Sequence, residues 1–156
     1  MRSIHTIAPT PHHKKYAIPP NTMSITALQA ATILTCHEFA AKFVVTGAIR
    51  LYSWLGPNKE EWMNSRIVKD LGKAQMNCSE YSALMAAPLF YLAAIGEAAS
   101  PMGVLLTLAG QIGYFYARVF DGYPKIPAAS FATIRYIGFF LICKQVAGLA
   151  YPGGKK

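Results

Sequence analysis

The sequence predicts an all-α protein, an integral membrane bundle of four helices that run up and down. Three observations predict this fold class. Hydrophobic residues make up 53% of the 156 residues and charged residues only 14%, whereas a soluble domain carries roughly a quarter of charged residues. Four apolar stretches are each close to the ~20 residues that a helix needs to cross the hydrocarbon core. Short turns join the later stretches, and short turns place neighbouring helices antiparallel.

Residues 1–22 form the first of two predicted regions. They are polar and basic, contain four prolines and lack the apolar central segment of a signal peptide, so we expect an extended arm. No acidic residue precedes Glu38, a bias that faintly resembles organelle-targeting segments. Residues 23–156 form the predicted membrane domain.

The four apolar stretches lie at residues 24–51, 77–99, 101–120 and 129–150. None of them is purely apolar. Polar side chains at such depth usually face the interior of a bundle or a wet cavity, and they are functional candidates by default. These polar residues are His37, Glu38 and Lys42 in the first stretch, Asn77 and Glu80 in the second, Gln111 and Arg118 in the third, and Arg135 and Lys144 in the fourth.

The connections set the predicted topology. Residues 52–76 are predicted as one long polar loop, Ser100 and Pro101 as a tight turn, and residues 121–127 as a further turn. We therefore expect the helices to alternate in direction, with both chain ends on one face of the membrane. Basic residues are divided nearly evenly between the two faces, so the positive-inside rule selects no orientation.

The net charge of +8 comes from 15 Lys and Arg against 7 Asp and Glu. Because the basic residues are scattered between apolar runs and form no known nucleic-acid motif, we expect no nucleic-acid partner. Anionic lipid headgroups or a small anionic substrate suit this distribution better.

The three cysteines, Cys36, Cys78 and Cys143, lie far apart in predicted helices. No pair has the spacing of zinc ligands or of a redox motif, and no histidine stands at a matching interval. We therefore expect three small buried side chains and no metal site.

One polar cluster stands at the start of the second apolar stretch, in the sequence KAQMNCSEYSALMAAPLF. Lys73, Asn77, Glu80 and Tyr81 share one face at helical spacing. A hydrated helix end would explain Lys73, but a carboxylate cannot reach far toward water, so Glu80 should have a cationic partner. Two interpretations stay open, a shared site for an anionic ligand and structural ion pairing.

Three motifs in order, NCSEY after KAQ, then YARVFDGY, then IRYIGF, resemble the membrane-associated proteins in eicosanoid and glutathione metabolism, the MAPEG family. The similarity covers about residues 45–150. NCSEY is most similar to the leukotriene C synthase branch, and the layout also suits the microsomal glutathione transferases. The resemblance implies a four-helix membrane protein that forms trimers, with glutathione held between neighbouring subunits.

The resemblance also implies a set of site residues. Arg135 matches the arginine that activates the thiol, and Lys73 occupies a position that is arginine in the family. Glutathione carries two carboxylates, an ammonium and a thiol, so its pocket needs cations, one acid and groups that fix its orientation. The residues implied to bind glutathione are Arg50, Lys73, Gln75, Asn77, Glu80, Tyr81, Arg118 and Tyr123.

The sequence departs from the family pattern in three places. Pro88 follows Glu80 by eight residues, farther than is usual, the segment from Arg118 to Tyr123 is two residues shorter, and the turn before Arg135 is longer. Two functions stay open. One is transfer of glutathione to a lipophilic electrophile, or reduction of a lipid hydroperoxide, in the endoplasmic reticulum or mitochondrial membrane. The other is a non-catalytic accessory protein or a structural subunit of a larger membrane assembly.

The first apolar stretch also bears on assembly. Glu38 and Lys42 stand at i and i+4, a spacing and order that favour pairing, with His37 beside them. In lipid such a set should face protein, so we expect a subunit interface in a homotrimer. The alternative is that the pair faces the interior of its own bundle.

Overall fold

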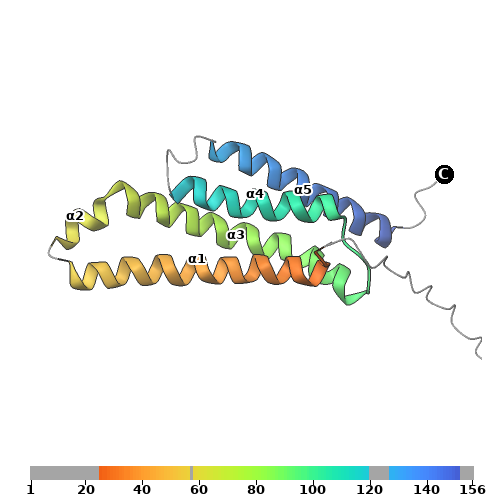
Figure 1. The fold of residues 1–156 in the computed structure, drawn as a ribbon, viewed down its shortest axis with the longest axis horizontal. Coiled ribbons are helices and arrows are strands. Elements are labelled where there is room, and N and C mark those ends of the chain that lie inside the picture. Colours follow the sequence, from red (N-terminus) through yellow and green to blue (C-terminus); the bar gives the residue numbers. More distant parts are fainter. Residues whose placement is uncertain (1–24, 57, 120–126, 152–156) are drawn as a thin grey trace, which may run out of the picture.

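The structure, a computed structural model, describes residues 25–56, 58–119 and 127–151 (Figure 1). These residues are almost entirely helical and contain no strand, so the all-α prediction is confirmed. The predicted arm at residues 1–22 and most of the turn predicted at 121–127 lie outside the described residues. The helices are α1 (Ala27–Leu55), α2 (Lys59–Asn64), α3 (Arg66–Ala94), α4 (Pro101–Val119) and α5 (Ala128–Ala150).

Side-chain caps explain where two of the long helices begin. Thr26 and Gln29 form a capping box at the start of α1, in which each side chain bonds the backbone of the other, at 3.2 and 2.9 Å. At the start of α4 the Ser100 hydroxyl accepts a bond from the Gly103 amide at 3.3 Å. Pro101 then occupies the first helical position, where its missing N–H costs nothing.

The prediction of one long loop over residues 52–76 is wrong. α1 continues to Leu55, α2 occupies part of the segment, and α3 already begins at Arg66. The start of α3 is an amphipathic helix end. Val68 and Ala74 are buried, Leu71 is partly buried, and the charged residues Lys69 and Lys73 are exposed. The polarity that suggested a loop therefore belongs to the outer face of a helix.

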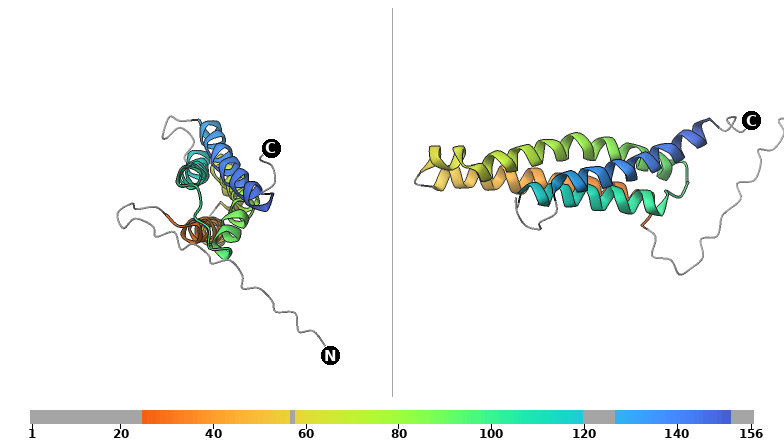
Figure 2. Two further views of the ribbon diagram at one scale, coloured as in Figure 1. Left: turned by 90° about the vertical axis from the view of Figure 1, so that its right-hand side faces the viewer. Right: turned by 90° about the horizontal axis from the view of Figure 1, so that it is seen from above.

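The helices pack as two antiparallel pairs. α1 lies along α3 and α4 lies along α5, and the two pairs meet mainly between α3 and α4 (Figures 1 and 2). The direction alternates along the chain, so α1 begins and α5 ends at the same end of the molecule (Figure 1). The predicted alternation of the long helices is therefore seen in the described residues, whereas the two chain ends of the prediction lie outside them.

Glycines on α4 and α5 bring these two helices unusually close. A methyl group on Gly110 would overlap the backbone of Arg135, and one on Gly138 would overlap the backbone and hydroxyl of Thr107. Small residues of this kind let helix backbones approach each other. The close seam between α4 and α5 fixes the position from which the side chain of Arg135 extends.

Two clusters of buried residues form the core. The larger cluster joins all four long helices, and its fully buried side chains include Leu34, Met85, Leu89, Leu92 and Ile142. The smaller cluster lies nearer to α2 and consists of Ala41, Val45, Ala74, Cys78 and Phe115.

Large apolar side chains also cover much of the outer surface. Two helices of the described chain, α1 and α5, are long and apolar enough to cross a membrane by length and composition. Buried core helices and signal sequences pass the same test, but only 19% and 17% of these two apolar windows are buried inside the protein. Apolar residues that are more than half exposed include Phe39, Phe43, Leu51, Trp54, Leu55 and Phe140.

Candidate functional site

The candidate site is built around the guanidinium of Arg135, two turns into α5. This side chain is only 1% exposed. Its Nη1 donates to the side-chain oxygen of Asn77 on α3 at 2.8 Å and to that of Gln111 on α4 at 2.9 Å. Both partners are amides, so they orient the cation without neutralising it.

Three tyrosine rings cover the same guanidinium. Its central carbon lies 4.0 Å from the ring centre of Tyr81, 4.6 Å from that of Tyr114 and 5.0 Å from that of Tyr136. Contacts of this kind stabilise a cation through the negative face of the ring. The Tyr136 hydroxyl also accepts a bond from Nη2, at the longer distance of 3.3 Å. Because Tyr136 is 44% exposed, it separates the buried cation from the surface.

One edge of the guanidinium is incompletely bonded, although it is buried. The Nε of Arg135 has no hydrogen-bond partner among the described residues. Within the same residues no ion pair joins Arg135 to a carboxylate, whereas Lys42 and Glu38 of α1 pair with each other at 3.1 Å. The edge formed by Nε and Nη2 thus carries a charge that no acid balances, and its Nε–H has no acceptor.

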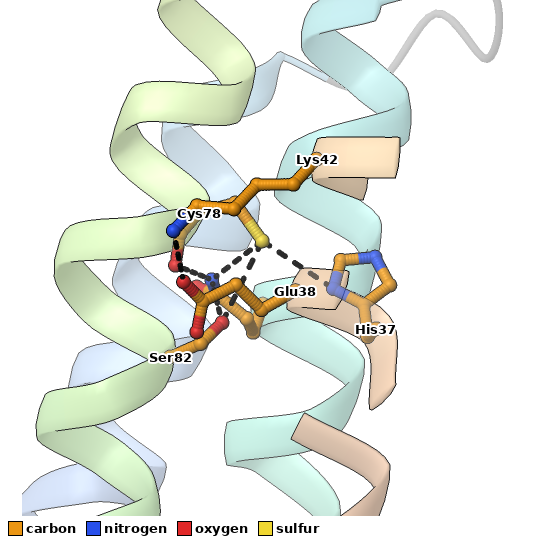
Figure 3. A network of polar contacts seen from close by, with 6 residues as sticks. His37, Glu38, Lys42, Cys78 and Ser82 are labelled. Carbon is orange, nitrogen blue, oxygen red and sulfur yellow. Dashed lines mark hydrogen bonds and ion pairs between the residues drawn. The ribbon is translucent and has the colours of Figure 1, made fainter. Parts of the chain in front are cut away.

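A chain of polar contacts leads from this cation to α1. The Nε2 of Gln111 donates to the hydroxyl of Ser82 at 3.1 Å and to the carbonyl oxygen of Cys78 at 3.4 Å. The sulfur of Cys78 lies 3.5 Å from the Ser82 hydroxyl and 3.5 Å from the Nδ1 of His37 (Figure 3). Figure 3 also shows the pair formed by Lys42 and Glu38 beside this chain. The contacts connect all four long helices.

The structure brings together three of the nine predicted site residues, namely Arg135, Asn77 and Tyr81. Arg135 lies in the interior, because the α4–α5 seam and the tyrosines enclose it. Of the remaining six, Gln75 and Arg118 are half-buried, Lys73, Glu80 and Arg50 are exposed, and Tyr123 lies outside the described residues.

Arg50 and Glu80 are not joined to this group. Arg50 lies on the outer face of α1, in a groove that it lines with Phe43 and Lys42. Glu80 makes no ion pair within the described part of the chain, so the cationic partner expected for it is not found there. If these residues serve the same ligand, a second subunit has to supply or complete their contacts.

Sequence reasoning missed several residues that complete the site. Gln111 was noted as polar within an apolar stretch, but its pairing with Arg135 was not predicted. Tyr114 stands at i+3 from Gln111 on the same helix face, a signal that could have identified it. Tyr136 and Ser82 gave no local signal, because their roles depend on how the helices pack.

The cysteines and histidine do not form a metal site within the described ranges, where no group of three or more His, Cys, Asp or Glu side chains is placed to hold an ion. Cys78 is buried and Cys143 half-buried, but Cys36 is exposed, so the prediction of three buried cysteines is wrong for Cys36. Cys36 faces outward from α1. Because α1 is apolar on most of its faces, the sequence pattern alone does not show which side chains point into the protein.

The chemistry that this arrangement favours is stabilisation of a small anion, because the buried guanidinium has an Nε–H without an acceptor and no carboxylate partner among the described residues. Comparisons with protein-family models, with curated proteins and with solved structures find no match for this chain.

Proposed function

We propose that this chain is a four-span integral membrane protein that binds glutathione and uses its thiolate on a lipophilic substrate. The reaction is transfer of glutathione to an electrophile or reduction of a lipid hydroperoxide. The motifs that resemble the MAPEG family support this proposal, as do the apolar, outward-facing helices α1 and α5. The same resemblance supports a homotrimer in the endoplasmic reticulum or mitochondrial membrane.

The observation that carries the proposal is the buried Nε of Arg135, which has no hydrogen-bond partner among the described residues. A buried charge without a counter-charge is costly, and proteins usually balance it with a carboxylate. Here amide oxygens and tyrosine rings surround the cation, and Nε is left without a partner. An anion seated at Nε and Nη2 would supply both the missing charge and the missing hydrogen-bond acceptor.

The thiolate of glutathione suits this edge. A free thiol has a pKa near ~8.5, so at neutral pH only a few per cent is in the reactive form. Arginine stays charged in a partly dry site, and each unit by which it lowers the thiol pKa corresponds to about 1.4 kcal/mol. Arg135 would therefore increase the fraction of thiolate without taking part in proton transfer.

Either reaction can be written with balanced atoms. In transfer, the sulfur forms a bond to the electrophilic carbon while the C–O bond of an epoxide or the π bond of a conjugated alkene breaks. The oxygen or carbon that receives the electron pair then takes up a proton, which replaces the one lost from the thiol. In peroxide reduction, the thiolate attacks the O–O bond and gives an alcohol, after uptake of a proton, and a glutathione sulfenic acid. A second glutathione then forms the disulfide and releases water.

Ligand entry requires a movement of Tyr136. Its hydroxyl occupies Nη2 at 3.3 Å, the longest of the hydrogen bonds to the guanidinium. The ring is partly exposed, so it can rotate outward and let the sulfur take the place of the hydroxyl. The carboxylates and ammonium of glutathione would then bind Lys73, Arg118 and Glu80 nearer the surface, with Arg50 supplied by a neighbouring subunit.

An accessory or structural role is the second candidate, and one observation favours it. Arg135 is almost completely buried, and both hydrogens of its Nη1 are already bonded to Asn77 and Gln111. A guanidinium held in this way can lock α3, α4 and α5 together without any chemistry. Such a protein would present a lipid to an enzyme or join a larger membrane assembly.

The test compares thiol ionisation in four proteins purified in mild detergent. Bound glutathione is titrated by thiolate absorbance in the wild type, in Arg135→Lys and in Arg135→Met, which removes the charge at similar volume. Lys144→Met, an exposed position on the same helix, is the matched control. We expect a lowered thiol pKa in the wild type and the control, an intermediate value with lysine and an ordinary value with methionine, together with loss of turnover. Identical titrations in all four proteins, without turnover, would leave the accessory or structural role.

A further inference from the structure

The amide of Gln111 has a single allowed orientation. Its side chain is 1% exposed, with Nε2 directed to Ser82 and Cys78 and Oε1 directed to Arg135. A flipped amide would place its NH₂ group against the guanidinium and its oxygen against the carbonyl oxygen of Cys78. The first contact would join two donors and the second two acceptors. The hydrogen-bond partners therefore hold the amide oxygen toward the guanidinium.

An amide at this position has a specific electrostatic consequence. Gln111 approaches Nη1 of Arg135 at 2.9 Å, a distance at which a carboxylate would form a buried ion pair. Glutamate has nearly the same shape as glutamine, so an acid would fit the volume of this position, with its second oxygen accepting from the Ser82 hydroxyl. Because Gln111 and Asn77 are both neutral, the charge of the guanidinium remains available to another anion.

We propose that Gln111 is a positioning residue that holds Arg135 in place without neutralising it, so that the charge is kept for the glutathione thiolate. This inference rests on the proposed function and adds that the reactivity of the bound thiol depends on an amide at position 111. Ser82 contributes indirectly, because its hydroxyl is the closer of the two oxygens that fix the amide.

The test separates thiol ionisation from binding of the rest of glutathione. Gln111→Glu and Gln111→Met are compared with the wild type in the full-length protein, by thiolate titration of bound glutathione and by the affinity for S-methylglutathione, which has no ionisable thiol. For Gln111→Glu we expect the pKa of the bound thiol to rise by about one unit, which lowers the thiolate fraction by up to about tenfold at a pH below both values. The affinity for S-methylglutathione should change by less than about twofold, since it makes no thiolate contact with Arg135.

Gln111→Met keeps the test valid if the glutamate variant does not fold. It removes the oxygen that holds Nη1 and adds no charge, so Arg135 loses its fixed position and the thiolate fraction should fall again. Ser82→Ala should give a smaller decrease, because the carbonyl of Cys78 still accepts from the amide. Thermal unfolding of each variant shows whether it is folded.

The outcomes distinguish this inference from the proposed function. If the wild type lowers the thiol pKa and both Gln111 variants do so equally, the role of Gln111 is overturned and the role of Arg135 stands. If affinity for S-methylglutathione falls in parallel with the thiolate fraction, Gln111 supports the fold only and the inference is overturned. If the wild type binds no glutathione, both proposals are overturned together.

Discussion

Gly110 of α4 lies directly against the backbone of Arg135 on α5, so close that a methyl group on the glycine would overlap the amide nitrogen, Cα and Cβ of the arginine. The contact sets the depth at which the guanidinium emerges between α3 and α4. Gly138, one turn further along α5, makes a comparable contact with Thr107. The placement of the cation therefore depends on the absence of side chains at two positions, as well as on the residues that bond to it.

Replacing Gly110 by alanine is expected to push α4 and α5 apart. The atoms in the way belong to the backbone, so relief requires a helix shift, and overpacking of this kind costs roughly 1–3 kcal/mol. Unfolding of Gly110→Ala in detergent, followed by circular dichroism, should show this loss. Gly148→Ala is the control, because no atom lies within 4 Å of its added methyl group. This change in an exposed helical position should leave stability equal or raise it by about 0.5–1 kcal/mol. Equal losses in both variants would contradict the importance of the α4–α5 seam.

Lys73 offers a test of the glutathione pocket at the surface. Lysine supplies the charge of an arginine but not the planar pair of donors that binds a carboxylate with two parallel bonds. We expect Lys73→Arg to bind glutathione more tightly and Lys73→Ala more weakly, each by about 1 kcal/mol for one charge-assisted bond. Isothermal titration calorimetry in detergent measures both. If neither substitution changes the affinity, residue 73 is only the hydrated outer face of α3.

The three cysteines should differ in reactivity toward an uncharged maleimide. In the native protein in mild detergent we expect Cys36 to react first, Cys143 more slowly, and Cys78 only after unfolding, because their exposure decreases in this order. Mass spectrometry of digested protein assigns the modified residue, and Cys36→Ser removes the fast phase. Modification of Cys78 as early as Cys36 would contradict its burial between His37 and Ser82.

The pair formed by Glu38 and Lys42 permits a test of the homotrimer. An exposed i,i+4 pair contributes only about 0.3–0.5 kcal/mol to its own helix, and the Lys42 side chain is 51% exposed. Lys42→Glu should therefore change the stability of one subunit little, but it should lower the trimer fraction in native mass spectrometry if this face contacts a neighbour. The swapped variant Glu38→Lys/Lys42→Glu restores the pair, and Lys144→Glu controls for charge. A monomeric mass for the wild type in mild detergent would contradict the trimer.

Local signals in the sequence predicted most of the helices. Apolar stretches of about 20 residues and the turn at Ser100 and Pro101 located α1, α4 and α5 and their alternating directions. The prediction failed over residues 52–76, since Val68 and Ala74 carry the buried face of α3 among polar neighbours that dominate its composition. Local polarity does not show which side of a helix another helix will cover.

The sequence predicted those site residues that lie within about one turn of each other on a helix or that match a motif. Asn77 and Tyr81 share a face of α3, and the structure brings this face against Arg135. The pairing of Arg135 with Gln111 joins two helices whose separation depends on Gly110, so no spacing in the sequence encodes it. The enclosure of Arg135 by tyrosines from three helices depends on packing in the same way.

The lengths of α1 and α3 have a consequence for how the molecule would sit in a bilayer. Each has 29 residues, which at 1.5 Å per residue is about 43 Å, whereas the hydrocarbon core is about 30 Å thick. The ends of these two helices, which α2 connects, extend past α4 and α5 (Figure 1 and the right-hand view of Figure 2). At this tip the rings of Tyr52 and Trp62 lie 4.2 Å apart, and Trp54 is 87% exposed. Such aromatic rings favour the headgroup layer. In a bilayer the tip would therefore lie at the membrane–water interface and fix how deeply the helices insert.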